Sequence, residues 1–226
     1  MLCLIAIALT SIKVPPEAMA RGNGLFFILG NAFFEGTGMF VILIFCCTTG
    51  NKLVAGEIDR GVMSFTMNTP TTRRELILSK ALFHLGAVLG MIVVTSVMFT
   101  IGFAAFHQDI SYAKFWQVVV GMCAYFVTVG GIVFFASCWF NKSSYSLLVG
   151  IGVPMLFYLL RTVSSIVSSM DFLKYLSINT LYDVNGITEG TANPAQWACK
   201  VVALFVMGGC FYVAGVIKFL RKDLPL

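Results

Sequence analysis

The two histidines are the first side chains to consider for chemistry, because imidazole can bind a metal ion or act as a general base near neutral pH. His84 and His107 lie at opposite ends of one apolar stretch. Neither belongs to an HExxH sequence, which would place two imidazoles on one face of a helix around zinc. We interpret each histidine as an interfacial residue at an end of that stretch, and the sequence predicts no metal site and no cofactor.

Nucleotide hydrolysis would need a glycine-rich loop ending in Gly-Lys-Ser or Gly-Lys-Thr to hold phosphate, and no such string occurs. No cluster of polar residues of the kind that a catalytic site requires is visible either. We therefore predict that the chain is not an enzyme. Its cysteines have no CxxC spacing, lie in or beside apolar stretches, and are interpreted as packing residues. They are Cys3, Cys46, Cys47, Cys123, Cys138, Cys199 and Cys210.

The amino-acid composition predicts the class of protein to which the chain belongs. Of 226 residues, 58% are hydrophobic and 11% are charged, with a mean hydropathy of +0.91. Such values lie outside the range of soluble globular domains and predict an all-α, polytopic transmembrane helix bundle. The net charge of +5 comes from basic residues beside apolar stretches. The bias toward cytoplasmic lysine and arginine, together with anionic lipid, accounts for that charge, so we predict a lipid bilayer and no nucleic acid as partner.

Six membrane spans are predicted, and the first is short. A helix over residues 1–12 would be about 18 Å long, whereas a hydrocarbon core of about 30 Å requires roughly 20 residues. We interpret this run as the outer half of a span in an incomplete chain, and not as a signal peptide, because no basic segment precedes it. The other spans are predicted at 25–49, 81–106, 115–140, 145–169 and 198–220. Gly86 and Gly90 have the GxxxG spacing that lets another helix approach closely.

The distribution of basic residues predicts the orientation of these spans. The segments assigned to the inside hold nine lysines and arginines, those assigned to the outside hold five, and Arg161 lies within a span. Cytoplasmic segments carry such an excess, so both termini are predicted to be cytoplasmic in a multi-pass protein of the plasma or inner membrane. Residues 50–80 then form a cytoplasmic loop and residues 170–197 an external loop. Without a repeat or a soluble segment, residues 1–226 are predicted to form one transmembrane domain.

Glu35 and Arg161 are the ionisable residues that the predicted spans enclose. Charges at depth are costly and mark functional sites by default. From the helical rise, Glu35 lies about 15 Å and Arg161 about 12 Å below the outer boundary. Two interpretations stay open. The residues could form an ion pair lining a cavity, or Arg161 could reach the outer headgroups while Glu35 is protonated or lies in a water-filled vestibule.

The loop at 50–80 carries structure of its own. Apolar residues recur at helical spacing from Leu53 to Phe65 among charged ones, which predicts an amphipathic helix at the membrane surface. The segment from Asn68 to Thr71 breaks this pattern. Thr72 and Glu75 then have the spacing of a capping box, so a new helix is expected to begin there and to continue into the next span.

The order of Glu57, Gly61, an apolar run, Pro70, Arg73-Arg74-Glu75 and Ser79-Lys80 resembles the cytoplasmic loop of type-2 ABC exporter permeases. The resemblance implies a coupling helix at residues 57–65 that docks on a separate ATPase subunit, and an elbow at residues 70–80 that transmits its movement. The residues it assigns to coupling are Glu57, Ile58, Asp59, Arg60, Gly61, Pro70, Arg73 and Arg74. The other interpretation is that any six-span protein needs a basic cytoplasmic loop, which can include a surface helix.

The resemblance implies a permease subunit of an ATP-driven exporter, which forms the translocation path as a homo- or heterodimer with a second permease. The alternative is a stand-alone membrane protein, either a secondary transporter or a peptide-immunity protein. A secondary transporter is expected to show inverted repeats and several intramembrane carboxylates, and the predicted spans enclose one carboxylate. Spans rich in phenylalanine and methionine suit an amphipathic peptide, a lipid or a hydrophobic drug, and equally suit ordinary packing.

Overall fold

A computed structural model describes residues 33–34, 36–63, 72–105, 111–166, 177–182, 184–189 and 193–222. Within these ranges the chain consists of helices and short connections, without strands. The prediction of an all-helical protein is confirmed. The short first span, Glu35, Pro70 and His107 lie outside the described residues.

Within the described ranges, four helices are long and apolar enough to cross a membrane: α7 (Arg73–Ala105), α8 (Tyr112–Trp139), α9 (Ser143–Ile166) and α12 (Pro194–Leu220). The shortest of them has 24 residues and is therefore about 36 Å long, which exceeds a hydrocarbon core of about 30 Å. The apolar helix α4 (Thr37–Leu53) has 17 residues and corresponds to the predicted span at 25–49. Five of the predicted spans thus have a helix in the structure, and a count of six stays a prediction.

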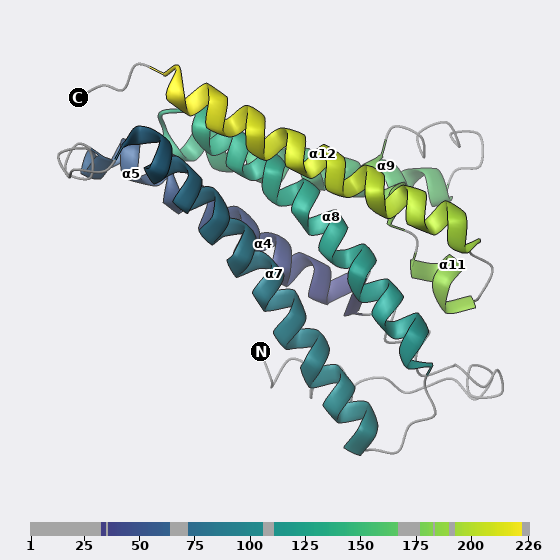
Figure 1. Cartoon of the computed structure of the whole chain (residues 1–226). Helices are drawn as coiled ribbons and strands as arrows, with labels where there is room; N and C mark the ends of the chain where they lie inside the picture. The colour runs from purple at the N-terminus through teal and green to yellow at the C-terminus, as the bar shows by residue number, and fades with distance from the viewer. Residues whose placement is uncertain are drawn as a thin grey trace.

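The helices lie side by side and alternate in direction, with α8 in the middle of the bundle (Figure 1). Helix α8 packs against α4, α7, α9 and α12 and is buried over most of its length. Its contact with α12 is the closest, because glycines meet there. A Cβ atom placed on Gly208 would lie 2.7 Å from the carbonyl carbon of Val127, and one on Gly131 would lie 2.7 Å from the Gly208 oxygen. The two backbones therefore touch at a position where only glycine fits.

No other helix of the described part of the chain approaches Gly86 or Gly90, so a close approach there stays a prediction for a helix of another protein. Both residues are exposed, and a Cβ atom on either would meet no other atom within 4 Å. The spacing alone did not identify the packed surface, because GxxxG sequences also occur on faces of a helix that meet no other helix of the chain.

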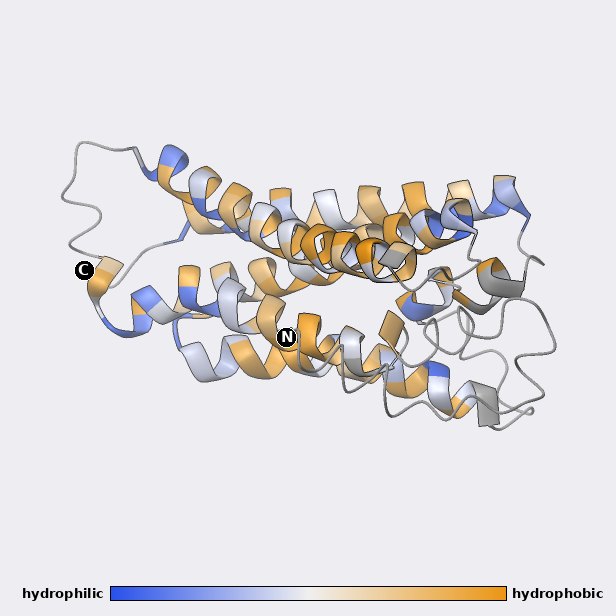
Figure 2. Ribbon diagram, turned by 90° about the horizontal axis from the view of Figure 1, so that it is seen from below, coloured by the Kyte–Doolittle hydropathy of each residue, from blue (hydrophilic) through white to orange (hydrophobic). Residues whose placement is uncertain are grey.

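Hydrophilic residues gather toward the ends of the bundle, and hydrophobic residues cover its middle (Figure 2). One end is formed by helix α5 (Ala55–Asp59), the first turns of α7 and α9, and the last turns of α8 and α12. We call it the charged end. The opposite end carries the 3₁₀ helix η3 (Ile178–Leu181) and helix α11 (Val184–Glu189), which both pack against α8. Both short helices belong to the predicted external loop.

Helix α5 is shorter than the predicted helix at residues 57–65. It follows α4 after a bend at Val54 and ends at Asp59, because Gly61 adopts a left-handed conformation with φ of 70°. Glycine reaches this conformation without steric cost and commonly ends helices. Val62 and Met63 are helical again. Ala55 and Gly56 are buried against the bundle while Asp59 is exposed, so α5 has one packed face, and its place on the membrane surface stays a prediction.

The predicted capping box at the start of α7 is confirmed. The Thr72 N–H donates to Glu75 Oε2 over 3.0 Å, and the Glu75 N–H donates to Thr72 Oγ1 over 3.3 Å. These bonds satisfy two donors that a helix N-terminus otherwise leaves unpaired. Helix α7 therefore begins at Arg73, eight residues before the predicted span, and it places Arg73 and Arg74 in its first turn.

Candidate coupling face and buried polar cluster

An ion pair between Glu57 and Lys80 ties α5 to α7. The Lys80 ammonium also donates to the carbonyl oxygen of Leu53 over 2.6 Å, at the end of α4. Lys80 is only 8% exposed. A charge that is buried to this extent requires a partner, because an unpaired ion there would lose its hydration without compensation. The pair therefore fixes the position of α5 against the spanning helix α7.

Hydrogen bonds tie the same segment to α8 and α9. The Ser143 N–H, at the start of α9, donates to Asp59 Oδ2 over 3.3 Å, and Asn51 Nδ2 donates to Ser143 Oγ over 2.6 Å. An acidic side chain beside a helix N-terminus also interacts favourably with the helix dipole. On α8, Ser137 Oγ accepts from the Ala55 N–H over 2.9 Å. Helix α5 is thus connected to three spanning helices.

The other residues assigned to coupling lie at the charged end. Ile58 packs against a buried apolar cluster that includes Val54, Ile77, Phe134 and Phe219. Arg60 is exposed, and its Nε donates to the Gly56 carbonyl within α5. The other exposed residues of the assigned set at this end are Asp59, Gly61, Arg73 and Arg74. The structure thus brings together all of the assigned residues that it describes.

Lys222, which sequence reasoning did not single out, closes the charged end by capping α8. Its ammonium donates to the carbonyl oxygens of Cys138, Trp139 and Phe140 over 2.9, 3.1 and 3.0 Å. A cation here complements the negative end of the α8 dipole. The pKa of Lys222 is lowered, mainly because the ammonium is partly buried. The nearby Cys138 raises this pKa, and the positive charge of Lys218 lowers it further. The end of α12 is thereby fastened to the end of α8.

His84 lies in the interior of the bundle, so its assignment as an interfacial residue is wrong. Its side chain is 0% exposed, and it stands eleven residues after Arg73, which is about 16 Å along α7. Its Nε2 lies 3.0 Å from the Cys46 carbonyl oxygen, and its Nδ1 lies 2.9 Å from Tyr212 Oη. Because a carbonyl oxygen can only accept a hydrogen bond, a neutral His84 donates one from Nε2 to the Cys46 carbonyl and accepts one at Nδ1 from the Tyr212 hydroxyl.

Two glycines make room for this buried polar cluster of His84, Tyr212 and Cys46. A Cβ atom on Gly130 would lie 2.8 Å from Tyr212 Oη, and one on Gly50 would lie 2.9 Å from His84 Nε2. The cluster joins α4, α7 and α12 through groups whose hydrogen bonds are satisfied by one another. In the sequence, the signal for this cluster was a single histidine among apolar residues. The residues that it contacts are distant from it along the chain, so the sequence did not identify them.

Arg161 donates from Nη1 to the carbonyl oxygens of Asn179 and Tyr182, each over 3.2 Å. These bonds join α9 to η3 and its C-terminal end, which sequence reasoning missed. An arginine that satisfies backbone carbonyls stabilises a bend that would otherwise leave acceptors unpaired. Because Glu35 lies outside the described residues, the ion pair between Glu35 and Arg161 stays a prediction.

Together, the apolar helices and the charged end define an integral membrane protein. The family profile described as ABC-2 family transporter protein matches residues 6–224, and the chain therefore belongs to this family. It is the membrane subunit of a transporter, a component that is typically non-catalytic. No curated protein matches the chain, and no solved structure matches it. In the described ranges, no group of three or more His, Cys, Asp or Glu residues could hold a metal ion.

Proposed function

We propose that the chain is the permease subunit of an ATP-driven exporter and that its charged end docks on a separate ATPase subunit. The ABC-2 family generally implies an ATPase partner, which supports this proposal. The observation that carries it is the attachment of α5 to α7, α8 and α9 through Glu57, Ala55 and Asp59. A displacement of α5 by a docked subunit would reach three spanning helices at once.

The exposed charges of the charged end suit such a docking surface. Asp59 is the last residue of α5 and Arg60 follows it, and Arg73 and Arg74 open α7, so both signs of charge are available to a partner. Charged groups at the rim of an interface steer association and fix its register. Under this proposal the whole chain is one transmembrane domain, and a second permease, identical or different, completes the translocation path.

The docking surface must lie in the cytoplasm, where ATP is available, so we propose that the charged end faces inward. A cysteine introduced at Gln196, which is exposed at the opposite end, is then expected to react with an impermeant thiol reagent added to intact cells. A cysteine at Lys142, exposed at the charged end, is expected to react only after the membrane is opened. The measurement is labelling above that of the unaltered chain. The reverse pattern would refute both the orientation and the docking assignment.

Replacing Glu57 with alanine is expected to lower substrate-stimulated ATP hydrolysis of the complex by at least about fivefold, the lower range of allosteric coupling between two sites. The change breaks the attachment of α5 to α7 while the contacts of Asp59 with α9 remain. Arg60→Ala, which changes a charge on the same segment, is expected to act in the same direction. The measurement is ATPase activity of the reconstituted complex with and without substrate.

Lys142→Ala is the matched control, because Lys142 is an exposed charge at the same end and lies outside α5. Its stimulated activity is expected to equal that of the unaltered chain. Membrane insertion and thermal unfolding of each variant, measured separately, distinguish lost coupling from lost folding. Full stimulation in both Glu57→Ala and Arg60→Ala would contradict the proposal.

A further inference from the structure

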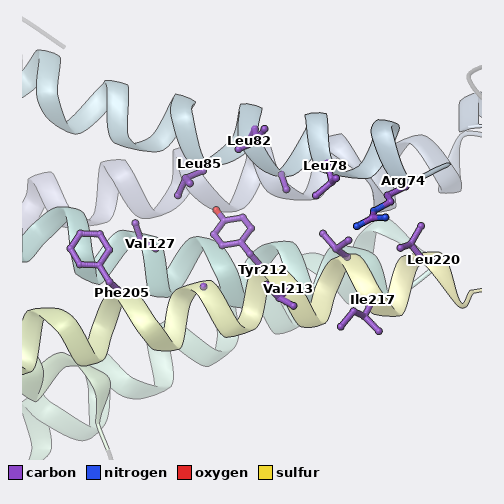
Figure 3. A pocket seen from close by; sticks show the side chains of 13 residues that line it. Arg74, Leu78, Leu82, Leu85, Val127, Phe205, Tyr212, Val213, Ile217 and Leu220 are labelled. Carbon is purple, nitrogen blue, oxygen red and sulfur yellow. The ribbon is translucent and has the colours of Figure 1, made fainter. Parts of the chain in front are cut away.

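A groove runs along the outside of the bundle between α7 and α12, with Val127 of α8 among its lining residues (Figure 3). Its volume is about 590 Å³. The wall on α7 includes Leu78, Leu82 and Leu85, and the wall on α12 includes Val213 and Ile217. Arg74 lies at the end of the groove that belongs to the charged end, and the same end is bordered by Leu220 (Figure 3).

On α7, the length of the groove matches the depth of one membrane leaflet. The groove extends there from Arg74 to Leu85, which is eleven residues or about 16 Å along the helix, and on α12 it extends from Phe205 to Leu220, which is fifteen residues or about 22 Å. Half of a hydrocarbon core of about 30 Å is about 15 Å. The groove also opens toward the lipid, because Leu82 is 68% exposed and Val213 is 59% exposed. An acyl chain aligned with the helices would therefore fit from the headgroup level to the middle of the bilayer.

The groove also contains two polar groups, the Tyr212 hydroxyl and the Arg74 guanidinium. The Tyr212 hydroxyl, which points toward α7, is hydrogen-bonded to His84. Arg74 is exposed, and the described residues include no ion-pair or hydrogen-bond partner for its guanidinium. A guanidinium can bind a phosphate group through two parallel hydrogen bonds. The groove is thus apolar along its length and has the positively charged guanidinium of Arg74 at one end.

We propose that this groove binds an anionic phospholipid from the leaflet on the side of the charged end. One acyl chain lies between α7 and α12, and the phosphate of the headgroup contacts Arg74. The site borders the surface proposed to dock the ATPase, because Arg74 belongs to both, and lipid binding by the chain alone requires no ATP hydrolysis. A lipid at this position would hold α7 and α12 apart at a fixed distance and would link the membrane composition to the position of α7.

Gly209 offers a direct way to fill the groove. It lines the groove, and a Cβ atom on it would meet no other atom within 4 Å, so Gly209→Leu adds a side chain to the groove without a backbone clash. Gly152→Leu is the matched control. Gly152 is an exposed glycine of α9 whose Cβ would also meet nothing, and it does not line the groove. Arg73→Gln is the control for Arg74→Gln, because Arg73 is exposed in the same helical turn and does not line the groove.

The test is native mass spectrometry of the full chain in detergent, with dioleoyl phosphatidylglycerol or dioleoyl phosphatidylcholine added. The unaltered chain is expected to retain phosphatidylglycerol more strongly. Arg74→Gln is expected to weaken phosphatidylglycerol binding by about tenfold, as for the loss of a charge-assisted hydrogen bond, and to weaken phosphatidylcholine binding less, because the choline cation already offsets the charge of that phosphate. Gly209→Leu is expected to weaken the binding of both lipids, while Arg73→Gln and Gly152→Leu bind as the unaltered chain does.

Equal retention of the two lipids by the unaltered chain would overturn the proposal. So would an equal loss in Arg73→Gln and Arg74→Gln, which would indicate a diffuse positive potential in place of a defined site. Full lipid binding by a folded Gly209→Leu would place the lipid elsewhere on the protein. Because the readout needs no ATPase, failure of this proposal and failure of the coupling proposal are separately observable.

Discussion

Gly208→Ala is expected to destabilise the bundle by about 1–3 kcal/mol, the usual cost of forcing a methyl group into a closely packed interior. The new Cβ atom would lie 2.7 Å from both the carbonyl carbon and Cγ1 of Val127. Carbon atoms pack at about 3.5–4.0 Å, so α8 and α12 would have to separate. Separation would weaken the contact all along the interface, because both helices are long and lie side by side (Figure 1). The measurement is thermal unfolding of the purified protein in detergent.

Gly209→Ala is the matched control for this prediction. The two glycines are neighbours in α12, and both substitutions gain about 1 kcal/mol of helix propensity. A Cβ atom on Gly209 meets no other atom within 4 Å, so Gly209→Ala is expected to be neutral or stabilising. A common change in unfolding temperature for the two variants would contradict the assignment of the α8–α12 contact to Gly208.

The spans could be predicted because a run of about 20 apolar residues has few other uses. Their packing could not be predicted, because in a membrane both the interior and the lipid-facing surface of a helix are apolar. On α7, Ile77 is 0% exposed while Leu82 is 68% exposed, and nothing in their hydropathy separates them. This is also why Gly86 and Gly90 were predicted to pack against another helix and Gly208 was not.

The candidate coupling residues could be placed at one end of the bundle because they follow or precede spans. The capping box of Thr72 and Glu75 depends on neighbours three residues apart and was predictable for the same reason. In contrast, the partners of Glu57 and Asp59 are Lys80 and the Ser143 backbone, 23 and 84 positions away along the chain. Such contacts depend on how the helices pack. Contacts between residues so far apart along the chain could not be predicted from the spacing of residues in the sequence.

His84→Ala is the second change with a large expected effect, about 2–4 kcal/mol of lost stability. Removing the imidazole leaves the half-buried Tyr212 hydroxyl without its acceptor, at a cost of about 1–3 kcal/mol. It also creates a cavity beside Phe134, and cavities of this kind add to the cost. Ser96→Ala is the control, because the buried Ser96 hydroxyl donates within its own helix, to the Ile92 carbonyl, and joins no second helix.

A double-mutant cycle separates the hydrogen bond from the cavity. Tyr212→Phe removes the hydroxyl and keeps the ring, so the double variant of His84→Ala with Tyr212→Phe leaves no unpaired hydroxyl behind. Hydrogen bonds between membrane helices contribute on average about 0.6 kcal/mol and at most about 1.7 kcal/mol, so the coupling between the two substitutions is expected in that range. The rest of the loss in His84→Ala belongs to packing. Additive effects in unfolding by a denaturing detergent would show that His84 and Tyr212 stabilise the bundle independently, and the histidine would then act as a space-filling residue between α4 and α7.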